Sequence, residues 1–502
     1  MPSKNLTIPR SSEKTPVAAA ENYERIPRPQ TIGFISLGCP KNLVDSEVMM
    51  GLLARSGAEL SPRVEDADVI VVNTCSFIES AQQESVNTIL EMAARKTSGR
   101  ARKLVVTGCL VERFRDEIRK RIPEVDAVVG TGELQNILAA TGVAPTPAPN
   151  ASPFVLLQSR AEGDARAAQG RFSRGQWDAA IANLPNYLYD DETPRVLATP
   201  KSTAYIKIAE GCDHPCTFCI IPQLRGQFRS RRFESVIAEA ERLAQAGVRE
   251  ITLIGQDTTC YGEEFGLKDG LALLLEKLAK IDDLRWIRFL YAYPNKITGR
   301  LLEAIGTHEK ICSYMDVPLQ HASANVLKRM KRGGGPDVFL RSISKMRSEI
   351  PALTLRTSFI VGFPGETDQE FEQLCDFVRE AQFDWMGTFA YSDQEGADAF
   401  ALDGKLPLRV IERRRKRLME IQRQISKKKK KALVGQEFDL LLEGMSEETD
   451  LLMEGRTAMH APEIDGKVFV NDFPPSAEPR PGEFYRCQIT EAHDYDLVAK
   501  IL

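Results

Sequence analysis

The sequence predicts an α/β protein with an N-terminal open parallel-sheet domain, a central partial (β/α) barrel and a small antiparallel β-barrel at the C-terminus. Three observations lead to this prediction. Short Val/Ile-rich runs alternate with helical patterns in the first two parts, which favours parallel strands joined by crossover helices. In the centre the pattern repeats at the length of a βα unit. From about Leu433 the chain changes to short strands punctuated by glycine and proline.

The length and composition are those of a folded protein with sizeable cores. The chain has 502 residues, 43% hydrophobic and 27% charged, with a formal net charge of −4. No apolar run approaches the roughly 18 residues that cross a bilayer. Residues 1–30 are polar and proline-spotted, so we expect a disordered leader, no membrane association and a cytoplasmic location. Ten cysteines without an export signal indicate a reducing compartment.

The N-terminal domain is predicted over residues 31–142. Buried-strand candidates cover 32–37, 68–72 and 103–107, and a helix is expected near 45–55. A cysteine follows each strand candidate by one to three residues: Cys39, Cys75 and Cys109. Because the carboxyl ends of parallel strands share one edge of a sheet, we expect these three thiols to converge. The alternative is three unrelated buried cysteines.

Residues 143–198 begin with closely spaced prolines and are predicted to be a linker or insertion of low order. The barrel is predicted over residues 199–431, and a site is expected at the carboxyl ends of its strands. A basic helix at 413–431 closes this part. The other expected elements are strands at 204–209, 250–254, 286–290, 314–317, 355–361 and 385–389, and helices near 233–246, 269–280, 324–331, 337–349 and 368–381.

Three cysteines of one loop have the spacing C-x3-C-x2-C: Cys212, Cys216 and Cys219. Three thiolates hold three irons of a cubane cluster and leave the fourth iron open to reactants, which predicts a catalytic iron-sulfur cluster. The alternative is a structural zinc loop with His214 or a distant residue as the fourth ligand. Structural zinc sites usually have a second ligand pair, and the sequence lacks one.

This loop, with Phe218 before its last cysteine, is similar to that of the radical S-adenosylmethionine (SAM) superfamily. With a three-cysteine α/β domain before it and a small β domain after it, the chain resembles the methylthiotransferases, whose terminal domain is called TRAM. Segments 36–47, 71–78 and 207–226 resemble the RimO branch, which modifies a ribosomal protein. The tRNA-modifying MiaB branch is similar but usually differs after the first cysteine.

The resemblance implies two [4Fe-4S] clusters and SAM as cofactors. It assigns the radical SAM cluster to Cys212, Cys216 and Cys219, and an auxiliary cluster to the three cysteines of the N-terminal domain. The implied reaction adds a methylthio group to the β-carbon of an aspartate in the small-subunit ribosomal protein twelve. It uses two SAM molecules per turnover and an electron donor that the sequence does not identify. A tRNA adenosine methylthiotransferase is the alternative.

Further candidates for contact with SAM are Phe218 beside the cluster and residues after predicted barrel strands, where barrel enzymes place their sites: Gln256, Gln320, Arg356, Ser358 and Gly362. For the glycine-rich strand ends the alternative is a plain turn. Core packing is the interpretation of the remaining cysteines, Cys260, Cys312, Cys375 and Cys487.

The C-terminal domain, residues 432–502, is strongly acidic. From Leu433 to Leu502 it has 15 acidic and 5 basic residues, a formal charge of −10. Such a surface repels RNA phosphates and suits a basic ribosomal protein as substrate. The alternative is a merely solvated acidic surface. The basic helix before it is compatible with RNA contact, but a solvated charged face is the preferred interpretation, so RNA contact is secondary.

Overall fold

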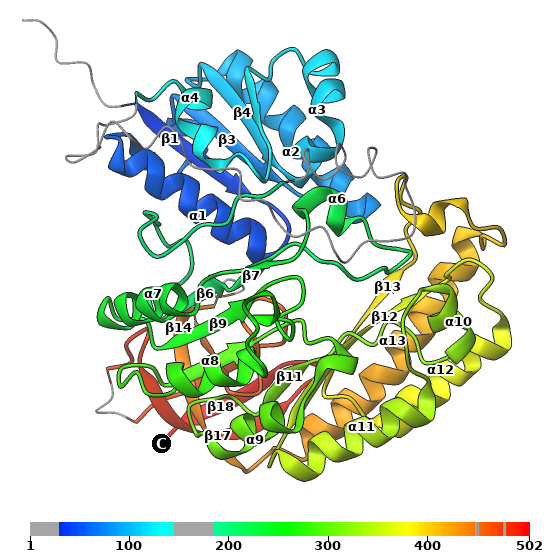
Figure 1. Ribbon diagram of the computed structural model, residues 1–502. Helices are drawn as coiled ribbons and strands as arrows, with labels where there is room; N and C mark the ends of the chain where they lie inside the picture. Colours follow the sequence, from blue (N-terminus) through cyan, green and yellow to red (C-terminus); the bar gives the residue numbers. More distant parts are fainter. Residues whose placement is uncertain (1–29, 145–184, 447–448, 450, 475–477) are drawn as a thin grey trace, which may run out of the picture.

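The computed structural model of the protein describes residues 30–144, 185–446, 449, 451–474 and 478–502. The expected leader, except for its last residue, and most of the expected linker lie outside the described residues. Figure 1 shows the N-terminal domain stacked on the barrel, and the C-terminal β-strands packed against the opposite end of the barrel. No helix in the described part of the chain combines the length and apolar character that a membrane span requires.

Five parallel strands form the sheet of the N-terminal domain in the order β2-β1-β3-β4-β5, which confirms the predicted parallel sheet. Two short edge strands, β2 and β5, were not predicted. The middle strand β3 reads VIVVNT and is buried at every position, because helices cover both faces of the sheet. The strands are β1 (Thr31–Ser36), β2 (Glu59–Ser61), β3 (Val69–Thr74), β4 (Lys103–Gly108) and β5 (Ala127–Val129).

Side chains of β3 alternate between two hydrophobic cores. Val71 packs in one core with Val48 of α1. Its neighbour Val72 packs in the other core with Ile89 of α2. Helix α1 begins at Pro40, earlier than the predicted start near residue 45, because proline suits the first helical position. The helices are α1 (Pro40–Arg55), α2 (Glu79–Ser98), α3 (Cys109–Arg121) and α4 (Ile137–Thr141).

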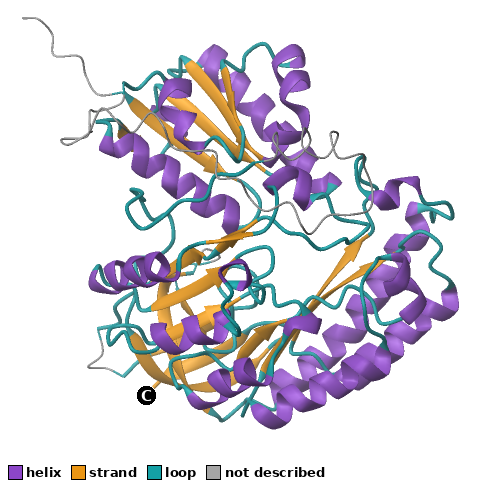
Figure 2. Cartoon of the chain, in the orientation of Figure 1, coloured by secondary structure: helices purple, strands orange, loops and turns teal. Residues whose placement is uncertain are grey.

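Six parallel strands form the partial barrel as two sheets, β6-β9-β10 and β11-β12-β13, joined by a bridge between Ile287 and Ile311. Strands β6 and β13 are not paired with each other within the described residues, so the barrel stays open between them (Figure 2). All six were predicted, β9 with the same bounds. The strands are β6 (Thr203–Lys207), β9 (Glu250–Ile254), β10 (Trp286–Phe289), β11 (Tyr314–Asp316), β12 (Thr354–Val361) and β13 (Trp385–Ala390).

Helices cover the outside of the barrel, and a short antiparallel pair, β7 (Ala209–Glu210) and β8 (Arg229–Ser230), brackets the loop that carries three cysteines. Helix α9 was not predicted. The helices are α6 (Ile221–Arg225), α7 (Phe233–Gln245), α8 (Gly270–Leu278), α9 (Gly299–Thr307), α10 (Ala324–Arg329), α11 (Pro336–Glu349), α12 (Asp368–Ala381) and α13 (Leu408–Lys431).

The basic helix α13 lies against β13 and α12 (Figure 1). It buries Leu418 and Ile425 in the barrel core, and Arg414 forms a buried ion pair with Glu366 at 2.9 Å. Other cations of the helix, including Lys428, are exposed. One face of the helix therefore packs on the barrel, and the opposite face is charged and solvated.

Five strands close into the C-terminal barrel in the order β14-β15-β16-β18-β17. Four of the five pairs are antiparallel, whereas β16 and β18 are parallel, so the predicted antiparallel barrel is wrong for this pair. The parallel pair closes the barrel between strands that are not consecutive in the chain. The strands are β14 (Glu437–Met445), β15 (Met453–Thr457), β16 (Val468–Asp472), β17 (Phe484–Ala492) and β18 (Leu497–Ile501).

The C-terminal barrel packs against the amino ends of the strands of the central barrel, and we call this contact the lower seam. Arg456 donates to Glu250, the first residue of β9, at 2.7 Å. Glu250 also pairs with Arg288 of β10, and all three side chains are buried. The indole of Trp385 donates to the carbonyl of Met459 at 2.8 Å. The lower seam therefore closes one end of the barrel with buried ion pairs and a hydrogen bond.

Candidate active site

The loop between β7 and β8 brings Cys212, Cys216 and Cys219 together, and we call them the loop triad. The backbone N–H of Cys212 donates to Gly226 at 3.2 Å, and that of Cys219 donates to Cys216 at 3.2 Å. The three cysteines are free and partly buried. Burial raises the pKa of Cys212 and of Cys219 to about 12, and the nearby Cys216 adds to both shifts. Three neighbouring thiols in such surroundings need a cation before all of them ionise.

Polar side chains hold this loop against the carboxyl ends of β9 and β10. The imidazole of His214 lies 2.6 Å from a carboxylate oxygen of Asp257 and stacks on Tyr293 at 3.8 Å between ring centroids. The thiol of Cys260 donates to the same carboxylate at 3.1 Å. Arg332 lies 3.5 Å from the sulfur of Cys216. The loop triad is therefore anchored and has a cation beside it.

The second set, Cys39, Cys75 and Cys109, comes from three strand ends, and we call it the sheet triad. Cys75 and Cys109 directly follow β3 and β4, and Cys39 follows β1 by three residues, as the expectation of converging strand ends requires. Burial raises the pKa of Cys109 to about 12, and Cys75 and Cys39 contribute to the shift. The three thiols therefore lie close enough to affect one another.

Two glycines permit this convergence. Gly38 has a φ of +92°, and a Cβ on it would lie 2.7 Å from the Cβ of Cys75 and 3.0 Å from its sulfur. Gly108 has a φ of +96°, and a Cβ there would lie 2.3 Å from the side-chain oxygen of Asn73. Both positions need the left-handed backbone and the missing side chain of glycine.

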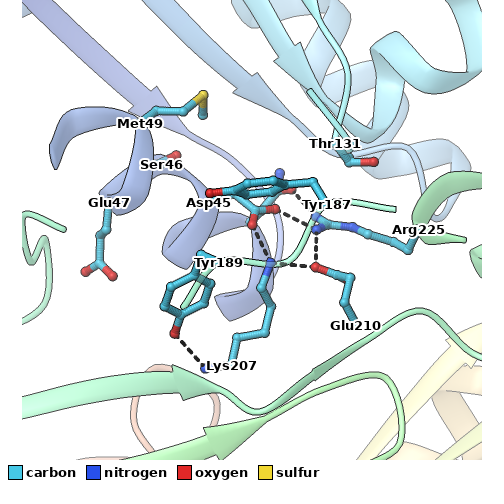
Figure 3. A network of polar contacts seen from close by, with 12 residues as sticks. Asp45, Ser46, Glu47, Met49, Thr131, Tyr187, Tyr189, Lys207, Glu210 and Arg225 are labelled. Atoms are coloured by element: carbon cyan, nitrogen blue, oxygen red, sulfur yellow. Dashed lines mark hydrogen bonds and ion pairs between the residues drawn. The ribbon is translucent and has the colours of Figure 1, made fainter. Parts of the chain in front are cut away.

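A buried ion network lies beside the sheet triad, where the N-terminal domain contacts the barrel at a contact that we call the upper seam (Figure 3). Asp45 of α1 accepts from Lys207 of β6 and from Arg225 of α6, both at 2.5 Å. Glu210 pairs with Lys207 at 2.5 Å and with Arg225 at 3.2 Å. Burial acts to raise the pKa of Glu210, but the two cations outweigh it and hold that pKa below its usual range.

The network reaches the sheet triad through Arg225. Its guanidinium donates to the side-chain oxygen of Asn42 at 2.6 Å, and that oxygen lies 4.0 Å from the sulfur of Cys109. Cys109 also packs in one buried cluster with Ile220 and Leu224, which follow the loop triad in the chain. The two triads therefore lie on facing sides of the upper seam, and Arg225 connects them.

The described end of the expected linker packs into this seam as well. Arg195 pairs with Glu47 of α1 at 2.5 Å and with Glu239 of α7 at 2.8 Å. Tyr189 donates to Glu239 at 3.1 Å. These residues join the N-terminal domain to the barrel.

Of the expected SAM contacts, Gln256, Gln320 and Gly362 follow the carboxyl ends of barrel strands, whereas Arg356 and Ser358 lie within β12. Gln256 donates to Glu210 at 2.5 Å, whereas its own side-chain oxygen is buried without a partner. Gln320 has a left-handed φ of +70°, and its backbone N–H donates to Ser358 at 2.9 Å. Phe218 packs beside a buried cluster that contains Phe363. Gln256 and Gln320 lie beyond the ends of β9 and β11, where a ligand would meet them, whereas Ser358 lies inside β12.

Two other candidates have structural partners. Arg356 pairs with Asp316 at 2.8 Å and with Asp465 of the C-terminal domain at 3.5 Å. Gly362 has a φ of +80°, and a Cβ there would lie 2.5 Å from Ile411 of α13, which is sufficient reason for glycine. Their contact with SAM stays a prediction.

The upper seam also contains several polar residues for which the sequence predicts no role: Lys41, Asn42, Asp45, Lys207, Glu210, Arg225 and Tyr291. Lys207 offered a signal in the sequence, because it is the one charged residue of the strand Thr203–Lys207 and stands at its end. The partner of that charge is Asp45, which lies 162 residues away in the chain. Sequence spacing therefore does not reveal the pair.

Family models match the three parts of the chain separately. An uncharacterized protein family, UPF0004, matches residues 31–130, the radical SAM superfamily matches residues 206–378, and the TRAM domain matches residues 434–502. The fold and the cysteine loop at the open end of the partial barrel thus define an enzyme of the radical SAM superfamily. Membership implies a [4Fe-4S] cluster and SAM as cofactors.

Two relatives cover nearly the whole chain. The ribosomal protein uS12 methylthiotransferase RimO of Koribacter versatilis (strain Ellin345) is 68% identical over 97% of this chain and 99% of its own length. The protein of the same name from Solibacter usitatus (strain Ellin6076) is 56% identical over 94% of each chain. The chain belongs to the RimO family of methylthiotransferases and is a transferase. The tRNA-modifying alternative finds no support in these relatives.

Proposed function

We propose that the protein adds a methylthio group to the β-carbon of an aspartate in ribosomal protein uS12, with two SAM molecules per turnover. The loop triad would hold the radical SAM cluster, and the sheet triad would hold an auxiliary [4Fe-4S] cluster. The single observation that carries this proposal is the presence of two sets of three free, converging thiols on facing sides of the upper seam. Three thiolates per cluster leave one iron open in each, as two separate tasks require.

The donor sets fit the proposed clusters. Thiolates are the usual ligands of iron-sulfur clusters. Gly38 lies so close to Cys75 that no larger residue fits at its position beside the sheet triad. Each triad also has a cation near it, Arg332 at the loop triad and Arg225 at the sheet triad. These cations offset the negative charge that three thiolates bring into a partly buried site.

When bound, the clusters and SAM would supply an electron, a carbon-centred radical and sulfur, which no protein side chain provides. The residues of the chain would hold these bound groups and orient them. His214 and Asp257 fix the loop triad against the strand ends. Gln256, whose buried side-chain oxygen has no partner within the described residues, is our first candidate for a contact with SAM. Gln320, Ser358 and Phe218 are the next candidates.

The C-terminal domain supports a basic protein as the substrate. Its exposed side chains include Glu437, Asp439, Glu483 and Glu491. Its Arg456 is turned inward, into the lower seam. An acidic surface attracts a lysine- and arginine-rich ribosomal protein and repels RNA phosphates. We also propose a cytoplasmic location, where thiols stay reduced and ribosomes are assembled.

Mass spectrometry of uS12 tests this function. We expect uS12 from cells that carry the gene to bear one methylthio group on an aspartate, and uS12 from a deletion strain to lack it. An unmodified aspartate in both strains, together with loss of methylthiolated adenosine from tRNA in the deletion strain, would overturn the proposal in favour of an RNA substrate.

A further inference from the structure

Lys41 is a buried cation at the upper seam without a carboxylate partner in the described part of the chain. The residue is 8% exposed. Its ammonium nitrogen lies 3.5 Å from the carbonyl oxygen of Gly255 and 3.4 Å from the ring centroid of Tyr291. No carboxylate oxygen of the described residues lies within 4.0 Å of it. By contrast, Lys207 in the same seam pairs with Asp45 and Glu210.

The position of Lys41 links the two triads. It follows Cys39 by two residues in the chain and is the second residue of α1, so its backbone belongs to the N-terminal domain. Its ammonium, however, contacts the barrel at Gly255, which directly follows β9, and at Tyr291, which follows β10. The ammonium therefore lies at the carboxyl ends of barrel strands, within reach of both halves of the site.

Tyr291 is held in an unusual conformation. Its φ of +63° is in the left-handed region, which a tyrosine rarely adopts. Its backbone N–H donates to Asp316 at 3.1 Å, and its carbonyl accepts from Thr258 at 3.2 Å. Strain of this kind persists where the surroundings impose it, often at functional sites. Here it places the face of the ring under the ammonium, which stabilises the cation without neutralising it.

We propose that the ammonium of Lys41 binds the side-chain carboxylate of the substrate aspartate, an inference that rests on the proposed function. The carboxylate carbon is bonded directly to the β-carbon that reacts, so an anchored carboxylate fixes the reacting atom. That atom has to meet chemistry from both triads, and Lys41 lies between the protein bodies that carry them. The carboxylate of such a substrate would form an ion pair with this buried ammonium, which has no carboxylate partner of its own within the described residues.

A second role, as counterion of the sheet triad alone, fits less well. Arg225 already serves that purpose, since its guanidinium bonds Asn42 beside Cys109. The ammonium of Lys41 contacts Gly255 and Tyr291 of the barrel, and within the described residues its interaction with Cys39 of the sheet triad is through charge and not through a hydrogen bond. The experiment separates the two roles, because a counterion affects binding of any substrate equally.

The test is a double-mutant cycle between Lys41 and the target aspartate. Reconstituted protein and its K41Q variant are titrated with recombinant uS12 and with uS12 whose target aspartate is replaced by asparagine. Lys277→Gln, at an exposed lysine on α8, is the matched control. We expect K41Q to bind aspartate-containing uS12 about tenfold to a hundredfold more weakly, as loss of a charged hydrogen bond predicts. Binding of the asparagine form should change less than about twofold by the same reasoning.

Equal weakening of both forms by K41Q, or equal binding of both forms by the unaltered protein, would overturn the inference. K41R, which keeps the charge, should retain part of the preference for aspartate. Iron content and the electron paramagnetic resonance spectrum are measured for each variant, and Lys41→Met replaces K41Q where the latter loses iron. If uS12 carries no methylthio group on aspartate at all, the proposed function fails. If it carries one and the preference is unchanged in K41Q, only the role of Lys41 fails.

Discussion

The upper and lower seams of the barrel both contain buried ion pairs, but the charged side chains of the two seams have different neighbours. Each has a buried carboxylate between two cations: Asp45 between Lys207 and Arg225 at the upper seam, and Glu250 between Arg288 and Arg456 at the lower one. At the lower seam these charges pair with one another. At the upper seam Arg225 also reaches the sheet triad, and Lys41 has no carboxylate partner within the described residues.

This difference shows what distinguishes a functional seam from a structural one. Both seams bury charged side chains. Burial of charge therefore does not identify a functional site, because paired buried charges are also found in purely structural contacts. A buried ammonium over an aromatic ring is not distinctive by itself, since Lys430 lies over Trp385 at the lower seam. The upper seam is different because it contains two sets of three thiols, and because the ammonium of Lys41 lies at the carboxyl ends of barrel strands. Groups of this kind need a ligand, and they mark the site.

Removal of either triad should have the largest effect and should separate the two tasks at the upper seam. Alanine at Cys212, Cys216 and Cys219 should lower the iron content from about eight to about four per chain and abolish cleavage of SAM. Alanine at the sheet triad should lower the iron equally, keep SAM cleavage and abolish methylthio transfer. Iron assay and chromatography of 5′-deoxyadenosine measure both. Cys375→Ala on α12 is the control, and a loss of iron there would contradict the assignment.

A matched pair of buried arginines tests the comparison of the seams directly. Arg225→Met and Arg456→Met each leave a buried carboxylate short of a partner, so the free energy of unfolding should fall by about 3–5 kcal/mol in both. Only Arg225→Met should also lose the iron of the sheet triad. The free energy of unfolding is measured by urea unfolding with tryptophan fluorescence as the signal, and the iron content is measured by iron assay. Equal iron in the two variants would show that the upper network is merely structural. Arg95→Met, at an exposed pair, should change little.

The lower seam predicts a pH effect that does not involve the site. Burial lowers the pKa of Lys430, which lies 3.5 Å from the ring centroid of Trp385, to about 8. The unfolded chain holds this proton up to about 10.5, so stability should rise between pH 8 and 10.5, by up to about 3 kcal/mol. Lys430→Met should remove that rise, whereas Lys428→Met, at an exposed position, should keep it. The same pH slope in Lys430→Met and the unaltered protein would refute the assignment.

Two glycines with similar φ angles give the test with the smallest expected effect. Gly38 and Gly57 have φ of +92° and +87°, so alanine should cost about 1–2 kcal/mol of strain at either position. Only at Gly38 would the new methyl group meet Cys75, because Gly57 has nothing within 4 Å. Gly38→Ala should therefore unfold at a lower temperature than Gly57→Ala and bind less iron. Identical iron contents would argue against close packing of the sheet triad around a cluster.

The sequence was informative where function depends on local spacing. The loop triad is a short motif, and the sheet triad could be predicted because each cysteine follows a strand whose apolar run is legible. Strand β9 was predicted with its observed bounds for the same reason. Helix α9 was missed, since its nine residues include two glycines and its formation depends on packing of side chains such as Leu301.

The ion networks could not be predicted from the sequence. Asp45 and Arg225 lie 180 residues apart, and neither has a local pattern that identifies its partner. The same holds for Lys41 and Gly255, which are 214 residues apart. A charge in an amphipathic helix usually faces solvent, so its burial becomes evident only when two domains pack together.

Arg225 lies six residues after Cys219 in the chain, yet its guanidinium faces Asn42 and Cys109 of the N-terminal domain. One short segment therefore supplies a cysteine of the loop triad and the charge partner of the sheet triad. As a consequence, the two halves are not interchangeable modules. An N-terminal domain grafted onto a foreign barrel would keep its three thiols and lose the cation that balances them. A change at Arg225 should therefore affect both halves of the site.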